Sequence, residues 1–466
     1  MSATGRAVVV GAGFAGLAAA AALTARGHDV TLLDRGSRVG GKAQHVLAAG
    51  ARVDLGPTIL TDPAPLIELF DLLGAPEDAA GLHRLDPGLI ATFPGGGRAA
   101  LHADPAQTAA ALATLGPHAS EDWDRVLALG DRAARLAEHF YARGDVASAR
   151  DLWRFLAGGG VRPGDVISFA RRGSLSRLLA ASVRTPELAR LLAHFARFIG
   201  LGAARAPAVT VVIPYLLATS GIWYPRGGFS ALAETIRDLA VKRGLALEMG
   251  QSVTRLEHAH GRVTAVLTAD GRRFPGDACV AAVDTAEIGR WAPEIPMDRR
   301  VRHSRPALAA RVAWWVLDDA AAGAHHALHF GEDGEDPVYV SMPTVSDADL
   351  APPGRAVLYA LTHGAPGLPA GPAFVQAMRQ RLEAARHWPG GTVIEQGASG
   401  ESSSCYGAEI GPGLFASFRP SQRVRGLCNV VRAGGSVFPG PGVANVIRSG
   451  LRAAILAGAF LAGKSA

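Results

Sequence analysis

The residues best suited to chemistry in this chain are glycines near its start. Gly11, Gly13 and Gly16 form the pattern GxGxxG, and Asp34 follows 18 positions after the last of them. The first glycine permits a tight turn, the second lets the backbone approach a pyrophosphate, and the third lets a helix pack closely on a strand. An acid at the end of the next strand can bind a ribose hydroxyl. The spacing predicts a dinucleotide site.

The flanking segments supply the elements that such a site needs. Residues 7–10 predict a buried strand, residues 17–26 an alanine-rich helix, and residues 30–34 a second strand. A glycine pattern between a strand and a helix is far more specific than the pattern alone. The expected cofactor contacts in this unit are Gly11, Ala12, Gly13, Phe14, Ala15, Gly16, Asp34 and Arg35.

A second group of glycines favours FAD over NAD. It comprises residues 39–42, with the letters VGGK, and residues 53–58, with the letters VDLGPT. A simple nicotinamide site does not need this addition, whereas a long, extended dinucleotide can use more backbone amides and one more positive charge. The expected contacts here are Gly41, Lys42, Gly56, Pro57 and Thr58.

Length and composition describe a globular protein with more than one domain. The chain has 466 residues, against roughly 100 to 200 for one domain. The mean hydropathy of +0.17 fits either a large apolar cavity or a membrane-facing patch. The longest apolar runs, residues 208–223 and 451–463, fall short of the roughly 18 residues of a spanning helix, so an integral membrane protein is not expected.

The cysteines and the first residues indicate the compartment. Cys279, Cys405 and Cys428 lie far apart and lack CxxC spacing, and one thiol would remain after any pairing. We expect all three to be reduced core residues. Residues 1–6 are short and polar, so we expect no signal peptide and a cytoplasmic protein, with peripheral membrane association left open. No cluster has metal-ligand spacing, and no metal is expected.

One basic segment accounts for the whole formal net charge of +6. Residues 169–205 contain seven arginines against one acid, Glu187. Arg190 and Arg197 project from one face of a predicted amphipathic helix, which either packs on the core with a solvated back or contacts a membrane surface. Nucleic acid is not expected, because stacking aromatics are not interleaved with the arginines. The apolar face consists of Leu188, Leu191, Leu192, Phe195, Phe198 and Ile199.

The alternation of dinucleotide-like and helical pieces predicts an α/β fold, α+β overall. A Rossmann-like FAD-binding domain is expected to be assembled from the discontinuous segments 1–75, 223–287 and 425–466. Residues 76–222 are expected to form a mainly helical cap that can face a membrane. Residues 288–424 are expected to form an inserted substrate-binding domain with a mixed sheet.

Local patterns predict the elements inside these segments. A helix is expected at residues 230–243, and a loop at residues 434–443 opens a helix at 444–461, where amides and dipole favour an anion or a polar ring edge. Asp284 is expected to cap a helix, and Trp314 and Trp315 to face opposite sides of a strand. Strands are expected at 245–249, 252–258, 262–268, 278–283, 311–317, 356–361 and 427–432, with a hairpin turn at 269–271. The remaining expected cofactor contacts are Val253, Gly435, Ser436, Gly442, Val443 and Ala444.

These pieces, in this order, resemble the FAD-dependent amine-oxidase-like flavoproteins, and within them the phytoene desaturase family of carotenoid desaturases and isomerases. Four blocks carry the resemblance: residues 11–16, residues 40–42 with 56–63, residues 223–228 and residues 434–443. The third and fourth look most like the hydroxyneurosporene-type branch. The chain departs from the family pattern at four positions. Lys42 stands where the family usually has arginine, and Phe438 stands where it usually has His. Ala444 stands where the family has Pro, and Asn445 stands where it has a small or apolar residue.

The resemblance implies removal of two hydrogens from a C–C bond of an acyclic polyene. A hydride would pass to flavin N5 and a proton would then leave the neighbouring carbon, so the cofactor performs the difficult step. The protein needs a long apolar tunnel that excludes water and aligns the bond. Glu409 is the candidate acid or base if one is needed. Candidate tunnel residues are Trp223, Tyr224, Tyr406, Phe418 and Phe438.

Other functions of the same fold remain open. An amine oxidase would act on a C–N bond with aromatic and acidic groups around the amine, and residues 223–228 argue against it. A carotenoid isomerase or a non-catalytic carrier of prenyl groups is also compatible with the fold, although a carrier needs no intact flavin site. The expected partners are a lipophilic polyene and a membrane surface.

Overall fold

The computed structural model describes residues 5–143, 162–296, 299–302, 304–332, 335–400, 408–409 and 419–463. Cys405 and the tunnel candidates Tyr406 and Phe418 lie outside these residues. Glu409 pairs through its backbone with Arg305.

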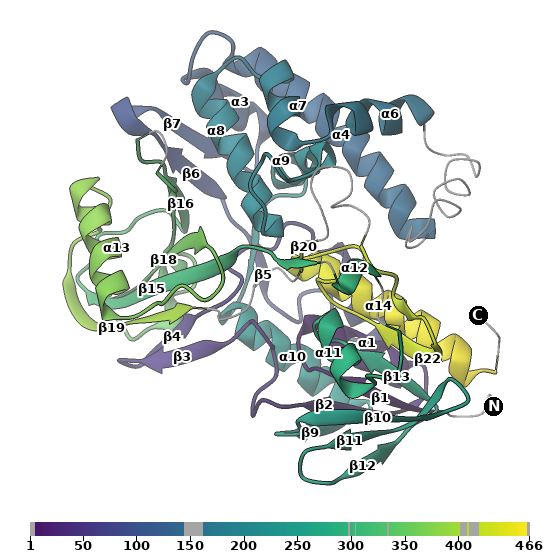
Figure 1. The fold of residues 1–466 in the computed structure, drawn as a ribbon. Coiled ribbons are helices and arrows are strands. Elements are labelled where there is room, and N and C mark those ends of the chain that lie inside the picture. The colour runs from purple at the N-terminus through teal and green to yellow at the C-terminus, as the bar shows by residue number, and fades with distance from the viewer. Residues whose placement is uncertain are drawn as a thin grey trace.

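A largely parallel sheet forms the lower part of the molecule (Figure 1). Its strands come from three distant stretches of the chain, as predicted for a dinucleotide-binding sheet built from separated segments. All neighbours pair in parallel except the edge strand β21. In spatial order the strands are β21 (Arg423–Val424), β22 (Leu427–Arg432), β13 (Ala278–Ala281), β1 (Arg6–Val10), β2 (Asp29–Asp34) and β9 (Ala246–Met249).

Both faces of this sheet are covered, which explains why β1 is apolar at consecutive positions. Ala7 and Val9 belong to the core that contains α1 (Phe14–Ala25), α10 (Gly228–Lys242) and α14 (Val443–Leu461). Val8 and Val10 point to the opposite side, into a second core. That second core is covered by β10 (Val253–Ala259), β11 (Arg262–Thr268), β12 (Arg273–Pro275) and α11 (Thr285–Trp291).

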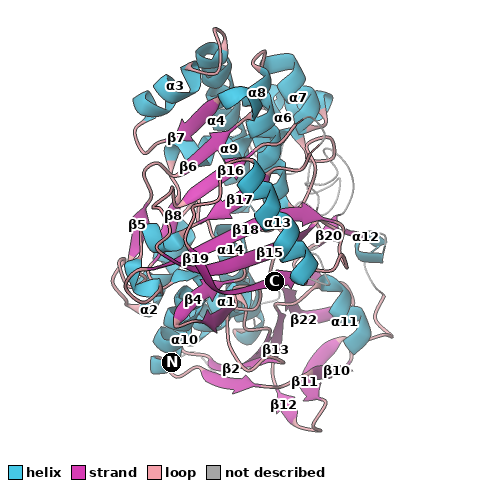
Figure 2. Ribbon diagram, turned by 90° about the vertical axis from the view of Figure 1, so that its left-hand side faces the viewer, coloured by secondary structure: helices cyan, strands magenta, loops and turns pink. Residues whose placement is uncertain are grey.

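A second, mostly antiparallel sheet rises beside the first and is seen as a ladder in Figure 2. Trp314 packs in the main core and Trp315 packs under α13 (Pro372–Ala384), so their predicted opposite orientation is confirmed. In order the strands are β19 (Thr392–Gly400), β15 (Ala309–Asp318), β18 (Arg355–Gly364), β17 (Val338–Ser341), β16 (His326–His329), β6 (Leu89–Thr92) and β7 (Arg98–Leu101).

Strands β6 and β7 lie within residues 85–101, where the sequence predicts short β-like runs broken by Pro and Gly. They complete the sheet that is otherwise built from residues 288–424. β6 pairs in parallel with β16, more than two hundred residues later in the chain. The domain limits remain a prediction, but the cap and the second sheet share this stretch of chain.

Helices from the same segment form the top layer in Figure 1. They are α3 (Pro105–Ala113), α4 (Ala119–Arg143), α6 (Pro163–Arg172), α7 (Leu175–Ser182), α8 (Pro186–His194) and α9 (Val212–Thr219), with short 3₁₀ turns η2 (Phe195–Ile199) and η3 (Ala208–Val211). The remaining elements are α2 (Ala64–Leu73), α12 (Arg299–Arg302), the strand pairs β3 (His45–Ala48) with β4 (Ala51–Asp54), β5 (Leu82–Arg84) with β8 (Trp223–Pro225), and β14 (Arg305–Pro306) with β20 (Ala408–Glu409), and the 3₁₀ turns η1 (Pro94–Gly96), η4 (Pro343–Val345) and η5 (Ala348–Leu350).

The basic segment of residues 169–205 contains the end of α6, α7, α8 and η2, and the arginines of α8 and η2 contact a neighbouring loop. Arg190 donates to the carbonyl of Gly331 at 2.7 Å and lies over the ring of Phe330, while Arg197 forms an ion pair with Asp336. Both side chains remain partly exposed, and the loop after β16 lies against them. Membrane contact by this segment remains a prediction.

Two further expectations have clear outcomes. Asp284 caps α11 by accepting a hydrogen bond from the amide of Ala286, as predicted. Cys279 is buried, but Cys428 is exposed on β22, so the prediction of Cys428 as a core residue is wrong.

The helix α14 is long and apolar enough to span a bilayer, yet 44% of its apolar stretch is buried and the helix packs on α1.

Candidate functional site

The first glycine loop connects β1 to α1 in a conformation that side chains would prevent. Gly11 has φ +103° and donates its amide to the carbonyl of Leu33 at 2.7 Å. A Cβ on Gly16 would lie 1.7 Å from the carbonyl oxygen of Gly11, so no other residue fits there without moving the loop. The close packing leaves the backbone amides at the start of α1 at the edge of the sheet, where a phosphate can be bound.

Asp34 ends β2 beside this loop. Its carboxylate accepts hydrogen bonds from the amide of Ala12 at 2.6 Å and from the amide of Gly36 at 2.7 Å. A carboxylate has about four lone-pair sites, so two bonds leave capacity for a ribose hydroxyl. The start of β10 is fixed nearby, because the amide of Gln251 donates to the carbonyl of Asp34, which brings Val253 toward the same end of the site.

The second glycine group lies directly on the first. Gly40 donates its amide to the carbonyl of Ala12 at 2.8 Å, and a Cβ on Gly41 would lie 3.0 Å from the Cα of Gly13. A Cβ on Gly56 would lie 2.2 Å from the carbonyl oxygen of Lys42. The structure therefore brings this second glycine group, which comes later in the chain, against the first glycine loop. The backbone of residues 11–16, 40–42 and 56–58 is here called the FAD groove.

The last loop closes the groove from the far end of the chain. β22 leads into Gly434, whose amide donates to the hydroxyl of Ser449 at 3.0 Å. A Cβ on Gly450 would lie 2.2 Å from the carbonyl oxygen of Ala15, so α14 crosses α1 at backbone contact. The starts of both helices, with their unpaired amides, thus face the same region. Three glycine-rich loops and two helix N-termini thus offer backbone amides to the phosphates of a dinucleotide.

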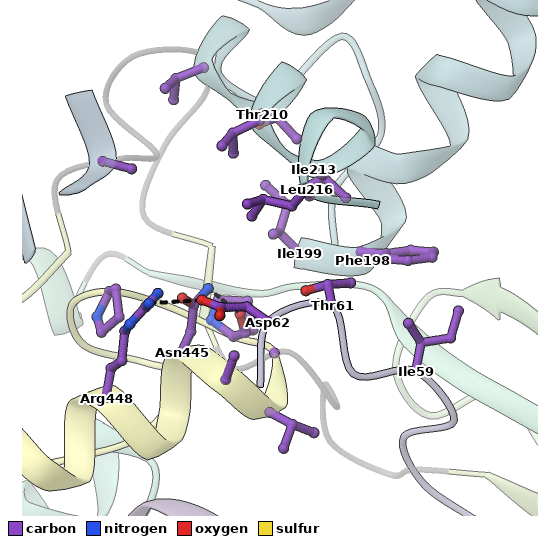
Figure 3. Close-up of a pocket in the computed structure, with 18 of the residues that line it drawn as sticks. Ile59, Thr61, Asp62, Phe198, Ile199, Thr210, Ile213, Leu216, Asn445 and Arg448 are labelled. Carbon is purple, nitrogen blue, oxygen red and sulfur yellow. Dashed lines mark hydrogen bonds and ion pairs between the residues drawn. The ribbon is translucent and has the colours of Figure 1, made fainter. Parts of the chain in front are cut away.

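A cavity of about 430 Å³ continues from this groove into the space beneath the helical layer (Figure 3). One end reaches residues 56–58 and the start of α14, where the cofactor residues lie. The apolar wall comes from α4, α6, η2, η3 and α9, and includes Phe169, Phe198, Ile199, Val209, Ile213 and Leu216.

Of the predicted tunnel residues, Phe438 lines this cavity, with its ring 5.7 Å from that of Tyr141. Trp223 and Tyr224 do not. The indole of Trp223 donates to the carbonyl of Ser220, and Tyr224 is buried against His325 and Phe229. They do not reach this cavity because β8 pairs with β5, behind the loop of residues 57–62 that forms its wall.

The titratable groups in the cavity include two neutral histidines, one ion pair and one buried cation. Burial lowers the pKa of His194 well below its usual value and that of His363 to about 3, so both rings are uncharged near neutral pH. Burial also lowers the pKa of Arg419 to about 10, which leaves it cationic, and it donates to the carbonyl of Gly435 at 2.9 Å. Asp62 forms an ion pair with Arg448 at 2.7 Å.

Several cavity residues escaped the sequence-based prediction, among them Asp62, Tyr141 and Arg448. Arg448 lies three positions after Asn445 on α14, and this spacing places both residues on one helix face. The departure from the family pattern at Asn445 could therefore have pointed to Arg448. Tyr141 sits at the far end of α4, 304 positions from Asn445, and no local pattern connects them.

Comparisons with known proteins identify the family of the chain. The family described as flavin containing amine oxidoreductase matches residues 14–368. Phytoene dehydrogenase of Streptomyces griseus is 33% identical over 96% of this chain and 94% of its own. Hydroxyneurosporene desaturase of Cereibacter sphaeroides is 30% identical over 98% of each chain.

Solved structures show the same fold. Putrescine oxidase aligns over 97% of this chain and 98% of its own, with a TM-score of 0.69 and 18% identity. Cyclohexylamine oxidase from Brevibacterium oxydans aligns over 99% of each chain, with a TM-score of 0.67 and 18% identity. The chain belongs to the flavin-containing amine oxidoreductase family, within the group of the phytoene desaturases, and its cofactor is FAD.

Proposed function

We propose that this protein desaturates a C–C bond of an acyclic carotenoid or related polyene. The observation that carries the proposal is the largely apolar cavity that opens directly onto the FAD groove and whose histidines are neutral. In the reaction a hydride and a proton leave adjacent carbons and a C=C bond forms between them. When bound, FAD supplies at N5 the acceptor for the hydride.

The protein's own residues would bind and align the substrate. The aliphatic and aromatic side chains of α9, η2 and η3 offer an apolar wall, and the loop of residues 56–62 forms the opposite wall. Such a cavity favours a hydrocarbon chain through the area it removes from water, at about 25 cal/mol per Å². It also excludes water from the bond that reacts.

The alternatives fit less well. A protonated amine needs an acidic partner, but in the described part of the cavity the carboxylate of Asp62 is already paired with Arg448. A non-catalytic prenyl carrier does not require the FAD groove that the three glycine loops build. A carotenoid isomerase remains compatible with the cavity and differs in its product.

The test is product analysis with FAD-loaded protein, an acyclic polyene and an electron acceptor. A desaturase releases a product with two hydrogens fewer and a longer conjugated chromophore. An isomerase releases a product of unchanged mass, and that result would refute the proposal.

We also propose that α6 contacts a membrane, from which a lipophilic substrate would enter. Val166 and Phe169 of this helix line the cavity, whereas Ile167 is 53% exposed and Arg171 is exposed at the end of the helix. An exposed apolar residue beside a cation suits an interfacial helix. Binding to vesicles of mixed zwitterionic and anionic lipids should weaken in Ile167→Glu.

The matched control for this test is Leu47→Glu. Leu47 is 74% exposed on β3, on the opposite side of the molecule from α6 (Figure 1). Equal vesicle binding by wild type and Ile167→Glu would refute the assignment of α6.

A further inference from the structure

One cation in the cavity beneath the helical layer has no anion beside it. Arg419 lines this cavity and is 9% exposed. Its guanidinium donates to the carbonyl of Gly435 at 2.9 Å, and it forms no ion pair within the part of the chain that the structure describes. A cation removed from water loses hydration free energy that one carbonyl does not restore. The position of Arg419 therefore favours an anion next to it.

The other titratable groups of the cavity do not supply this negative charge. The carboxylate of Asp62 is already in an ion pair with Arg448, as Figure 3 shows. Burial lowers the pKa of two histidines and raises the pKa of one phenol, which keeps three further groups uncharged near neutral pH: His194, His363 and Tyr141. Among the residues that the structure describes, Arg419 is thus the uncompensated charge of the cavity.

Arg419 lies where the cavity meets the last glycine loop. A Cβ on Gly440 would lie 2.9 Å from Nε of Arg419, so the guanidinium packs directly on the backbone of this loop. Residues 442–444, at the start of α14, line the same cavity, and the first amides of the helix add the positive end of its dipole. Residues 11–16, which are expected to bind the pyrophosphate and are all described, do not line the cavity. Arg419 is therefore on the side of the site where the reacting bond must meet the flavin ring.

Oxidation of a substrate supplies a negative charge on that side. A hydride carries two electrons and one proton, so its transfer from a neutral substrate to N5 of FAD adds one unit of negative charge to the ring. A fixed cation in a site that excludes water stabilises the state in which such a charge has developed, and it does so without reorganising.

We propose that Arg419 stabilises the negative charge that bound FAD gains on reduction and thereby raises its reduction potential. This inference goes beyond the proposed function, because it concerns the cofactor and applies to any substrate that gives up a hydride. A charge-assisted hydrogen bond of this kind corresponds to a preference for reduced over oxidised FAD of about 10- to 100-fold, which equals about 30 to 60 mV for a two-electron couple.

The experiment is an equilibrium titration of full-length, FAD-loaded protein with a reductant and a reference dye, followed by flavin absorbance without any polyene. Wild type is compared with Arg419→Met, which removes the charge, and with Arg419→Lys, which keeps it. The matched control is Arg423→Met in β21, where the exposed arginine lies over Phe460. The dissociation constant of oxidised FAD is measured for each variant by rebinding FAD to the deflavinated protein.

The reduction potential of Arg419→Met should lie about 30 to 60 mV below that of wild type. Arg419→Lys should recover most of this difference, and Arg423→Met should match wild type. The dissociation constant of oxidised FAD should change less than that of reduced FAD, since the added charge belongs to the reduced state.

Wild type alone provides a second measurement, which does not depend on FAD binding by a variant. On the acid side of neutrality its reduction potential should fall by about 30 mV for each unit of increasing pH, because one proton accompanies two electrons when the reduced ring stays anionic. A slope of about 60 mV per pH unit would mean that a second proton neutralises the ring, and it would overturn the inference.

An unchanged potential in Arg419→Met would also overturn it. If the dissociation constants of oxidised and reduced FAD then rise equally, Arg419 is a partner of the phosphates and not of the ring. Because no polyene is present, these results are independent of the product analysis that tests the proposed function.

Discussion

Asp54 is a carboxylate whose burial makes the stability of the protein depend on pH. It lies at the end of β4, where its side chain accepts from the amide of Phe229 and from the hydroxyl of Ser230, each at 2.7 Å. Burial raises its pKa from 3.8 to about 6, and the two hydrogen bonds and Arg52 offset only part of that effect. The carboxylate joins β4 to the start of α10, beside the FAD groove.

The direction of the effect follows from the raised pKa. Below about pH 4 the carboxyl is protonated in both the folded and the unfolded protein, and its ionisation does not affect folding. Between about pH 4 and pH 6 the unfolded chain ionises first, so the free energy of unfolding falls as pH rises. Above about pH 6 the carboxyl is ionised in both states, and the free energy of unfolding stops falling on its account. The total decrease, which follows from the difference between the two pKa values, is about 3 kcal/mol.

The perturbation is Asp54→Asn, which keeps an oxygen for the amide of Phe229 and can donate to the hydroxyl of Ser230. Urea unfolding of FAD-loaded wild type and variant should be compared from about pH 4 to about pH 7. The free energy of unfolding of the variant minus that of wild type should increase by about 3 kcal/mol across this range. Other titrating groups cancel in the difference, and Asp349→Asn is the control at an exposed carboxylate. A difference that stays constant, or that decreases as pH rises, would refute the reasoning.

Two further predictions concern packing and thiol reactivity. In α14, Gly450→Ala should weaken FAD retention and lower the melting temperature, because its Cβ would lie 2.2 Å from the carbonyl oxygen of Ala15. The control is Gly458→Ala on the same helix, where the atom nearest to the new Cβ is 3.8 Å away. This control should leave FAD retention and the melting temperature unchanged. Equal effects of the two substitutions in FAD content and thermal melts would contradict this account. Burial raises the pKa of Cys279 to about 12, whereas Cys428 is exposed, so a thiol reagent should label Cys428 in the native protein and Cys279 only after unfolding. Peptide mass analysis checks this, and native labelling of Cys279 would show that the sheet core opens.

The FAD groove was predictable because its requirements are local. Gly11 and Gly16 must lack side chains for β1 and α1 to pack, and this steric demand is written in consecutive residues. The strand at residues 427–432 and the strand at 262–268 were likewise predicted with their observed limits, since apolar alternation and turn residues define them.

The cavity beneath the helical layer was predicted less well because contacts between distant residues build it. Tyr141 meets Asn445, and Thr58 meets Tyr339 at 2.7 Å, across hundreds of residues. Trp223 and Tyr224 looked suitable by residue type, but the pairing of β8 with β5 decides where they point. The contact of Arg190 with the carbonyl of Gly331, 141 residues later in the chain, has the same cause.

The most direct test of the proposed desaturation is anaerobic mixing of FAD-loaded protein with acyclic polyenes, hydroxylated polyenes and amines, followed by flavin absorbance. The proposal predicts that polyenes bleach the oxidised flavin band while amines leave it unchanged. Bleaching by amines alone, or a flavin that stays oxidised with every polyene, would contradict it.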